Sequence, residues 1–125
     1  MIHLDTSFLI RSLIPGSSEG ACVESWISTQ VPLRVSAVCW AEFLCGPLNT
    51  SDVPFLEQLL GEPLSFTGAD AERAAALFNS AGRRRGQLVN CMIAATALRE
   101  KASLATSNIA DFVRFQSSGI RLERF

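Results

Sequence analysis

The chain has 125 residues, of which 48% are hydrophobic and 18% are charged. This length and composition suit one folded domain, residues 1–125, and they argue against general disorder or a scaffold that depends on disulfides. The formal net charge of −1 argues against a surface built mainly to bind nucleic acid, although the adjacent arginines Arg83, Arg84 and Arg85 allow local contacts with phosphate.

The sequence predicts neither a membrane-spanning segment nor a leader peptide. Its longest apolar runs are far too short to cross a bilayer, and the first residues lack a basic stretch. No C-x-x-C pair occurs, and the only histidine, His3, falls in the first predicted strand, so a zinc site is not expected. We therefore expect a cytoplasmic protein whose cysteines are buried and reduced, namely Cys22, Cys39, Cys45 and Cys91.

Short apolar segments alternate with segments of helical periodicity in the first half of the chain. In chain order, we predict a strand, a helix, a strand and two helices over residues 1–4, 8–14, 32–36, 37–45 and 52–60. A further helix begins at Ser17 or Ser18 and runs through Ile27. Asp5 or Thr6 caps the first of these helices, and Asp52 caps the last.

The second half continues the same alternation. In chain order, we predict an edge strand, two helices, a strand, a short helix and a last strand over residues 64–66, 70–81, 88–101, 103–106, 109–115 and 120–123. Residues 82–86 form a basic loop between glycines. Strands that alternate with helices indicate an α/β fold with a mostly parallel central sheet.

Polar side chains follow the predicted strands. Asp5 comes directly after the first strand, Glu42 lies in the helix after the second, and Asn108 follows the strand over residues 103–106. Because the carboxyl ends of parallel strands meet at one edge of a sheet, we expect these side chains to lie close together.

Each of these residues also has an ordinary interpretation. Asp5 can cap a helix, Glu42 can be a partly exposed helix residue, Asn108 can shape a turn, and Asp111 can lie on the surface. Their joint placement carries more weight, because clustered carboxylates repel one another unless a hard cation such as Mg²⁺ or Mn²⁺ binds between them. Such a site can activate water against a phosphodiester without a histidine or serine base.

Four motifs, in order along nearly the whole chain, resemble the PIN-domain family and, within it, VapC-type toxins. The motifs are Leu4-Asp5-Thr6-Ser7-Phe8-Leu9-Ile10, Ala41-Glu42-Phe43, Asn90-Cys91-Met92-Ile93-Ala94-Ala95-Thr96-Ala97-Leu98 and Leu104-Ala105-Thr106-Ser107-Asn108-Ile109-Ala110-Asp111-Phe112. The resemblance implies a three-layer α/β/α fold and an endoribonuclease that binds Mg²⁺ or Mn²⁺ in an acidic pocket.

The resemblance also assigns roles to residues. Asp5 would be the first metal ligand and Glu42 the second acid, while Asn90 occupies the place of the third. The fourth place falls on Asn108 or on Asp111. The hydroxyl groups of Thr6, Ser7 and Thr106 would orient carboxylates or water, and beside such a site the side chains of Arg83, Arg84 and Arg85 become candidate contacts for RNA phosphates.

Asn90 departs from the family pattern, which has aspartate there. Asparagine is nearly isosteric with aspartate but carries no charge, so we expect the fold to survive while metal affinity and activity fall. A natural loss of the acid and a deliberate change that allows a toxic nuclease to be produced are both compatible with this residue. We favour the second, because the other motifs are intact.

Two functions follow from the resemblance. The first is an RNA-cleaving toxin that is neutralised by a cognate antitoxin protein and that forms a homodimer. The alternative is a degenerate, non-catalytic PIN domain that binds protein or RNA. Trp26, Trp40 and Phe43 are candidates for an apolar partner groove, although core packing is the more common fate of such residues.

Overall fold

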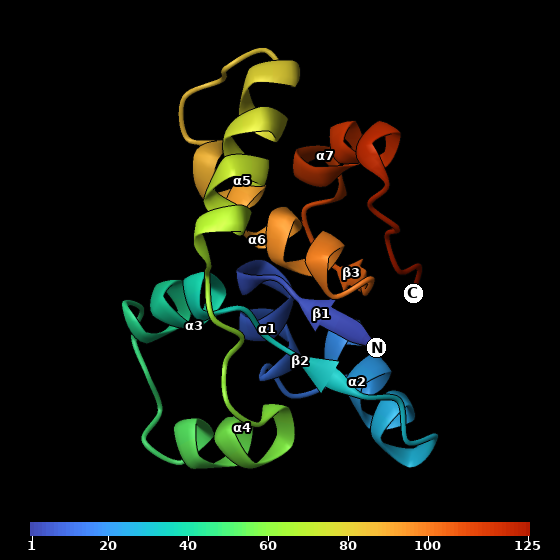
Figure 1. Cartoon of the computed structure of the whole chain (residues 1–125). Helices are drawn as coiled ribbons and strands as arrows, with labels where there is room; N and C mark the ends of the chain where they lie inside the picture. Colours follow the sequence, from blue (N-terminus) through green and yellow to red (C-terminus); the bar gives the residue numbers. More distant parts are fainter.

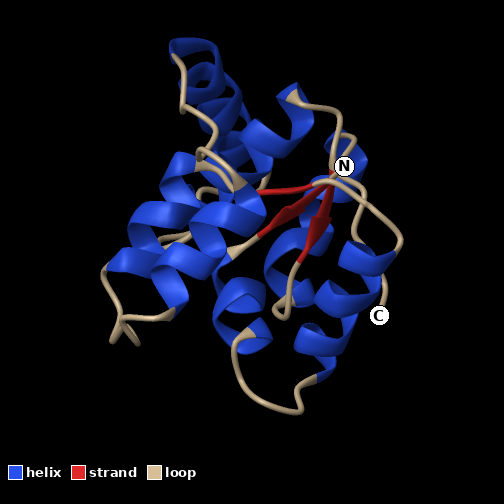
Figure 2. Ribbon diagram, turned by 90° about the horizontal axis from the view of Figure 1, so that it is seen from below, coloured by secondary structure: helices blue, strands red, loops and turns tan.

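A computed structural model describes all 125 residues and has three parallel strands at its centre. The strands are β1 (Ile2–Leu4), β2 (Leu33–Arg34) and β3 (Ser103–Ala105), and they lie in the order β2-β1-β3. Ile2 pairs with Leu33 on one side and with Ser103 on the other. Helices lie on both sides of the strands, as Figure 2 shows, which confirms the predicted three-layer α/β fold.

Helices make up most of the rest of the chain (Figure 1). They are α1 (Thr6–Ser12), α2 (Ser18–Ser28), α3 (Ala37–Leu44), α4 (Asp52–Leu60), α5 (Gly68–Ser80), α6 (Leu88–Arg99), α7 (Ile109–Phe112) and the 3₁₀ helix η1 (Val113–Ser118). The first crossover takes the chain from β1 to β2, and the second returns it to the other side of β1. The connections therefore diverge at β1, which is where parallel sheets commonly form their sites.

The core surrounds the central strand. All three residues of β1 are buried, as expected for a parallel strand that is covered on both faces. Helix α6 packs beside α5 and near β3, and its small residues Ala94 and Ala97 are fully buried, which allows this close approach. None of the helices is both long and apolar enough to cross a membrane.

Side-chain caps set the start of several helices. Asp5, Ser17 and Ser36 accept hydrogen bonds from backbone amides in the first turns of α1, α2 and α3. Helix α5 starts two residues earlier than predicted, because Thr67 and Asp70 form a reciprocal capping box around Gly68. The predicted cap at Asp52 is wrong: Asp52 is the first residue of α4, and Ser51 before it makes no side-chain cap.

Two predicted strands are reduced to single bridges, Ser36 with Leu64 and Leu104 with Leu122. After Leu64, the backbone is used elsewhere: the carbonyl of Ser65 accepts from Arg99, and the amide of Thr67 donates to Asp70. The segment after residue 120 meets β3, which is itself only three residues long, through one bridge. Neither segment can extend a ladder under these conditions.

Candidate functional site

The candidate site lies beyond the carboxyl end of β1, at the point where the connections diverge. The amide of Asp5 still donates to the carbonyl of Ala105 in β3 at 3.0 Å, so the sheet fixes the backbone of this residue. Its side chain then caps α1 by accepting from the amide of Phe8 at 2.8 Å. The predicted capping role is thus present, and it coexists with a position at the sheet edge.

The carboxylate of Asp5 is buried and held by hydroxyl groups. Ser7 Oγ lies 2.9 Å and 3.1 Å from the two carboxylate oxygens, and Thr106 Oγ1 donates to Oδ2 at 2.6 Å. Burial raises the pKa of Asp5 above its usual value, and the nearby Glu42 acts in the same direction, whereas the hydrogen bonds oppose the shift. A bound cation would favour the ionised form of this carboxylate.

Glu42 reaches the same place from α3. Its side chain accepts from Thr6 Oγ1 at 2.5 Å, and the residue is exposed, so it does not carry the cost of an unpaired buried charge. Asp5 and Glu42 both line one open cavity of about 270 Å³. Its lining residues are Asp5, Thr6, Ser7, Ile10, Glu42, Asn90, Ile93 and Asn108.

Asn90 and Asn108 complete the polar lining. Asn90 lies in the first turn of α6, and its Nδ2 donates to Gln87 Oε1 at 3.2 Å. Asn108 stands just before α7, and its amide donates to Thr106 Oγ1 at 3.0 Å. Asp111 belongs to α7 and is not among the residues that line the cavity, so the structure places Asn108, rather than Asp111, beside Asp5.

The donor atoms of this cavity suit a hard cation in type but are poor in charge. Two carboxylates and two side-chain amides supply oxygen atoms, which Mg²⁺ and Mn²⁺ prefer. The thiol of Cys39 near Thr6 is buried, and burial raises its pKa so far that it stays protonated. No three His, Cys, Asp or Glu side chains of the chain are grouped to hold a metal ion. An aspartate at position 90 would add the missing charge.

Three polar residues near the cavity were not singled out from the sequence. Ser107 donates to Glu19 Oε2 at 2.7 Å, and its amide donates to Ser7 Oγ at 3.2 Å. Gln87 is the partner of Asn90. Glu19 follows two serines at a predicted helix start, where an acid is ordinary, so its contact with residue 107 has no local signal.

The other predicted contact residues lie outside this cavity. Arg83, Arg84 and Arg85 are exposed in the loop between α5 and α6 and do not line it. Trp26 stacks on Phe8 with ring centroids 5.6 Å apart, and Trp40 stacks on Phe43 at 5.4 Å, so the three candidate groove residues pack against the core. Cys39 and Cys91 are buried as predicted, but Cys45 is exposed and Cys22 is half-buried, contrary to the prediction, and all four thiols are free.

A second cavity, of about 300 Å³, is mainly apolar and lies among α1, α2 and α4. Three large residues on its lining are half exposed to solvent: Ile14, Ile27 and Phe55, at 53%, 45% and 51%. Large apolar side chains that share an exposed hollow are common at sites of protein contact.

Comparisons with known proteins agree with this architecture. FitAcB from Neisseria gonorrhoeae is 21% identical with a TM-score of 0.72, and the match covers 99% of this chain and 97% of that one. VapBC2 from Rickettsia felis, bound to a DNA fragment from their promoter, is 20% identical with a TM-score of 0.78, and the match covers 100% of this chain and 99% of that one. VapC20 from Mycobacterium tuberculosis, a Sarcin-Ricin loop cleaving toxin, is 15% identical with a TM-score of 0.69, and the match covers the whole of both chains.

At these identities, the solved structures show a shared fold. No curated protein matches the sequence significantly. The PIN domain family model matches residues 2–116, which include every residue that lines the cavity at Asp5. The chain therefore belongs to the PIN domain family.

Proposed function

We propose that this chain is a VapC-type toxin whose cavity at Asp5 is the site of Mg²⁺- or Mn²⁺-dependent RNA cleavage, weakened by Asn90. One observation carries the proposal: Asp5, Glu42, Asn90 and Asn108 come from four separate parts of the chain and line a single cavity at the carboxyl edge of the sheet. The structurally similar VapC20 is a Sarcin-Ricin loop cleaving toxin, which agrees with the proposal.

In this proposal Asp5, Asn90 and Asn108 would hold the cation, and Glu42 would act beside it. When bound, the ion would supply Lewis acidity and stabilise the developing charge of the phosphodiester. Ser7 and Thr106 fix the orientation of the Asp5 carboxylate, and Thr6 does the same for Glu42. Asn108 takes the fourth position, because it lines the cavity.

Asn90 explains why the present chain would be a weak enzyme. Its amide oxygen can still coordinate a cation, but it brings no charge, and its Nδ2 group is occupied by Gln87. We expect Asn90→Asp to raise the affinity for Mn²⁺ by at least about tenfold and to produce RNA cleavage in Mg²⁺. Calorimetric titration with Mn²⁺ and cleavage of a panel of folded and single-stranded RNAs measure the two effects.

The controls separate the site from the fold. Asn90→Ala is expected to be no more active than the present chain and to keep its circular dichroism spectrum, and adding Glu42→Gln to Asn90→Asp is expected to abolish cleavage. If Asn90→Asp binds no Mn²⁺ and cuts no RNA while it stays folded, the nuclease proposal is wrong, and the alternative of a non-catalytic domain that binds protein or RNA takes its place.

The proposed partner is a cognate antitoxin, and a toxin-antitoxin complex from Klebsiella pneumoniae that is structurally similar supports it. The apolar cavity among α1, α2 and α4 is the surface that suits an apolar segment of such a protein. Homodimer formation stays a prediction.

We expect Ile14→Asp or Phe55→Asp to abolish copurification with the co-expressed antitoxin, because a charge would replace an apolar contact. Glu72→Ala, on the exposed surface of α5, is the matched control and is expected to change nothing. Retained copurification by both cavity variants would place the antitoxin on another surface.

A further inference from the structure

We propose that Glu19 is a positioning residue of this site: its carboxylate anchors the loop of residues 106–108, which brings Thr106 and Asn108 to Asp5. The inference rests on the proposed function for its effect on metal binding, whereas the anchoring itself can be tested without a metal. Glu19 lies in the first turn of α2, outside the cavity that Asp5 lines.

The contact between Glu19 and the loop is well formed. Glu19 is only 8% exposed, and its Oε2 atom accepts from Ser107 Oγ at 2.7 Å while Oε1 accepts from Ser18 Oγ at 3.0 Å. The hydrogen bond from Ser107 is the main reason that the pKa of Glu19 lies below its usual value. The carboxylate is therefore ionised at neutral pH, and a hydrogen bond to an ionised acceptor is stronger than one between neutral groups.

Hydrogen bonds of three successive residues, Thr106 to Asn108, connect this contact with the surroundings of Asp5. Thr106 Oγ1 donates to Asp5 at 2.6 Å, and the amide of Asn108 donates back to Thr106 Oγ1 at 3.0 Å. Between them, the amide of Ser107 donates to Ser7 Oγ, which itself contacts Asp5. Ser107 thus contacts Ser7 with its backbone amide and Glu19 with its side chain.

Little else holds this loop from the outside. Helix α7, which follows it, has no side-chain cap, and Asn108 is exposed. The Ser107 hydroxyl has Glu19 as its hydrogen-bond partner. Thr106 is fully buried whereas Asn108, two residues later, is exposed, so the contact with Glu19 holds the loop where it leaves the core. Small misplacements of groups around a metal ligand weaken such a site.

The anchoring is tested first in the chain as it stands. Glu19→Ala and Ser107→Ala are each expected to speed amide hydrogen exchange at Ser107 and Asn108 by about tenfold, the loss expected for one hydrogen bond to a charged group. Glu19→Gln keeps an acceptor oxygen and is expected to retain most of the protection. Glu72→Ala is the control. Unchanged exchange in both alanine variants, or equal acceleration throughout α2, would overturn the anchoring.

The effect on the site is tested in the Asn90→Asp background. We expect Glu19→Ala or Ser107→Ala to weaken Mn²⁺ binding by about tenfold. The double variant should weaken it no further, because both changes break one contact. Additive losses, or unaltered binding, would overturn the positioning role. If the Asn90→Asp parent binds no Mn²⁺, then the proposed function fails, and the exchange measurement still decides the anchoring.

Discussion

His3 and Asp5 are two positions apart along β1 and its end, and both are buried, yet their surroundings differ. Asp5 accepts hydrogen bonds from Phe8, Ser7 and Thr106, whereas neither ring nitrogen of His3 has a partner. Burial lowers the pKa of His3 to about 4 and raises that of Asp5. A buried carboxylate that accepts several hydrogen bonds is held in place, as a binding site requires. A buried histidine without hydrogen-bond partners is costly to protonate, so it makes the fold sensitive to acid.

We expect His3 to make the chain less stable as pH falls from 7.5 to 4.5. Above its unfolded pKa of 6.5 the ring is neutral in both states; below it, only the unfolded state takes up the proton until the folded pKa near 4 is reached. Between these pH values, His3 lowers the free energy of unfolding by about 2–3 kcal/mol. Urea unfolding at both pH values measures it.

The matched variant for this measurement is His3→Leu, which fills the same core position without a titrating group. Asp5 has a raised pKa and acts in the opposite direction, but it contributes equally to both proteins, so the difference between them isolates His3. Equal pH dependence of the two proteins would contradict the expectation.

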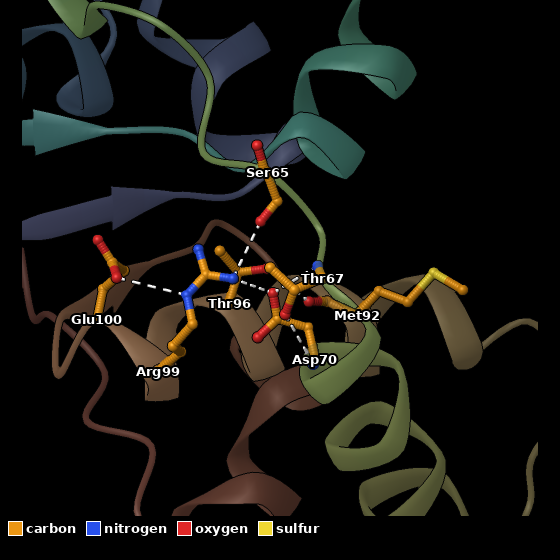
Figure 3. A network of polar contacts seen from close by, with 7 residues as sticks. All are labelled: Ser65, Thr67, Asp70, Met92, Thr96, Arg99 and Glu100. Atoms are coloured by element: carbon orange, nitrogen blue, oxygen red, sulfur yellow. Dashed lines mark hydrogen bonds and ion pairs between the residues drawn. The ribbon is translucent and has the colours of Figure 1, made fainter.

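At the scale of elements, an ion pair ties α5 to α6. Arg99 at the end of α6 contacts the buried Asp70 of the α5 capping box and donates to the carbonyl of Ser65 at 3.0 Å (Figure 3). The same contacts explain why residues 64–66 do not form a strand, because the backbone groups that follow Leu64 bond to Arg99 and Asp70 instead of to a neighbouring strand. Periodicity in the sequence could predict both helices, but a contact between residues 70 and 99 depends on how they pack.

We expect Arg99→Met to lower the free energy of unfolding by about 3 kcal/mol, because it leaves the carboxylate of Asp70 buried without its cation. Adding Asp70→Asn should recover part of the loss, since the uncompensated charge is then removed. Urea unfolding measures both. Arg73→Met, at an exposed position of α5, is the control, and an equal loss there would show that the ion pair contributes nothing.

For the whole molecule, the sequence predicted the order of the helices, the three strands of the parallel sheet and the family, because these depend on local periodicity and contiguous motifs; the two further strands that it predicted are single bridges. It could also bring Asp5, Glu42 and Asn108 to one edge, since strand ends in a parallel sheet share an edge. It could not predict the contact of Glu19 with Ser107, whose positions are 88 residues apart, or that Asn108 and not Asp111 lines the cavity, because both depend on the exact path of the loop after β3.

Charge distribution over the molecule gives a last prediction. The loop that carries Arg83, Arg84 and Arg85 directly precedes α6, whose first turn carries Asn90, so on a chain of net charge −1 a basic segment ends a few residues before a residue of the candidate site. We expect Arg84→Gln/Arg85→Gln to weaken RNA binding and to reduce the slope of log affinity against log salt by about 1.4, or about 0.7 for each lost phosphate contact.

Fluorescence anisotropy with a labelled single-stranded RNA at several salt concentrations measures this slope. Arg121→Gln/Arg124→Gln removes the same charge from exposed positions near the end of the chain and serves as the control. Because both variants change the net charge equally, a general electrostatic attraction would alter both slopes alike. A reduced slope in the Arg84/Arg85 variant alone would mark the loop as a phosphate contact, and equal slopes would exclude it.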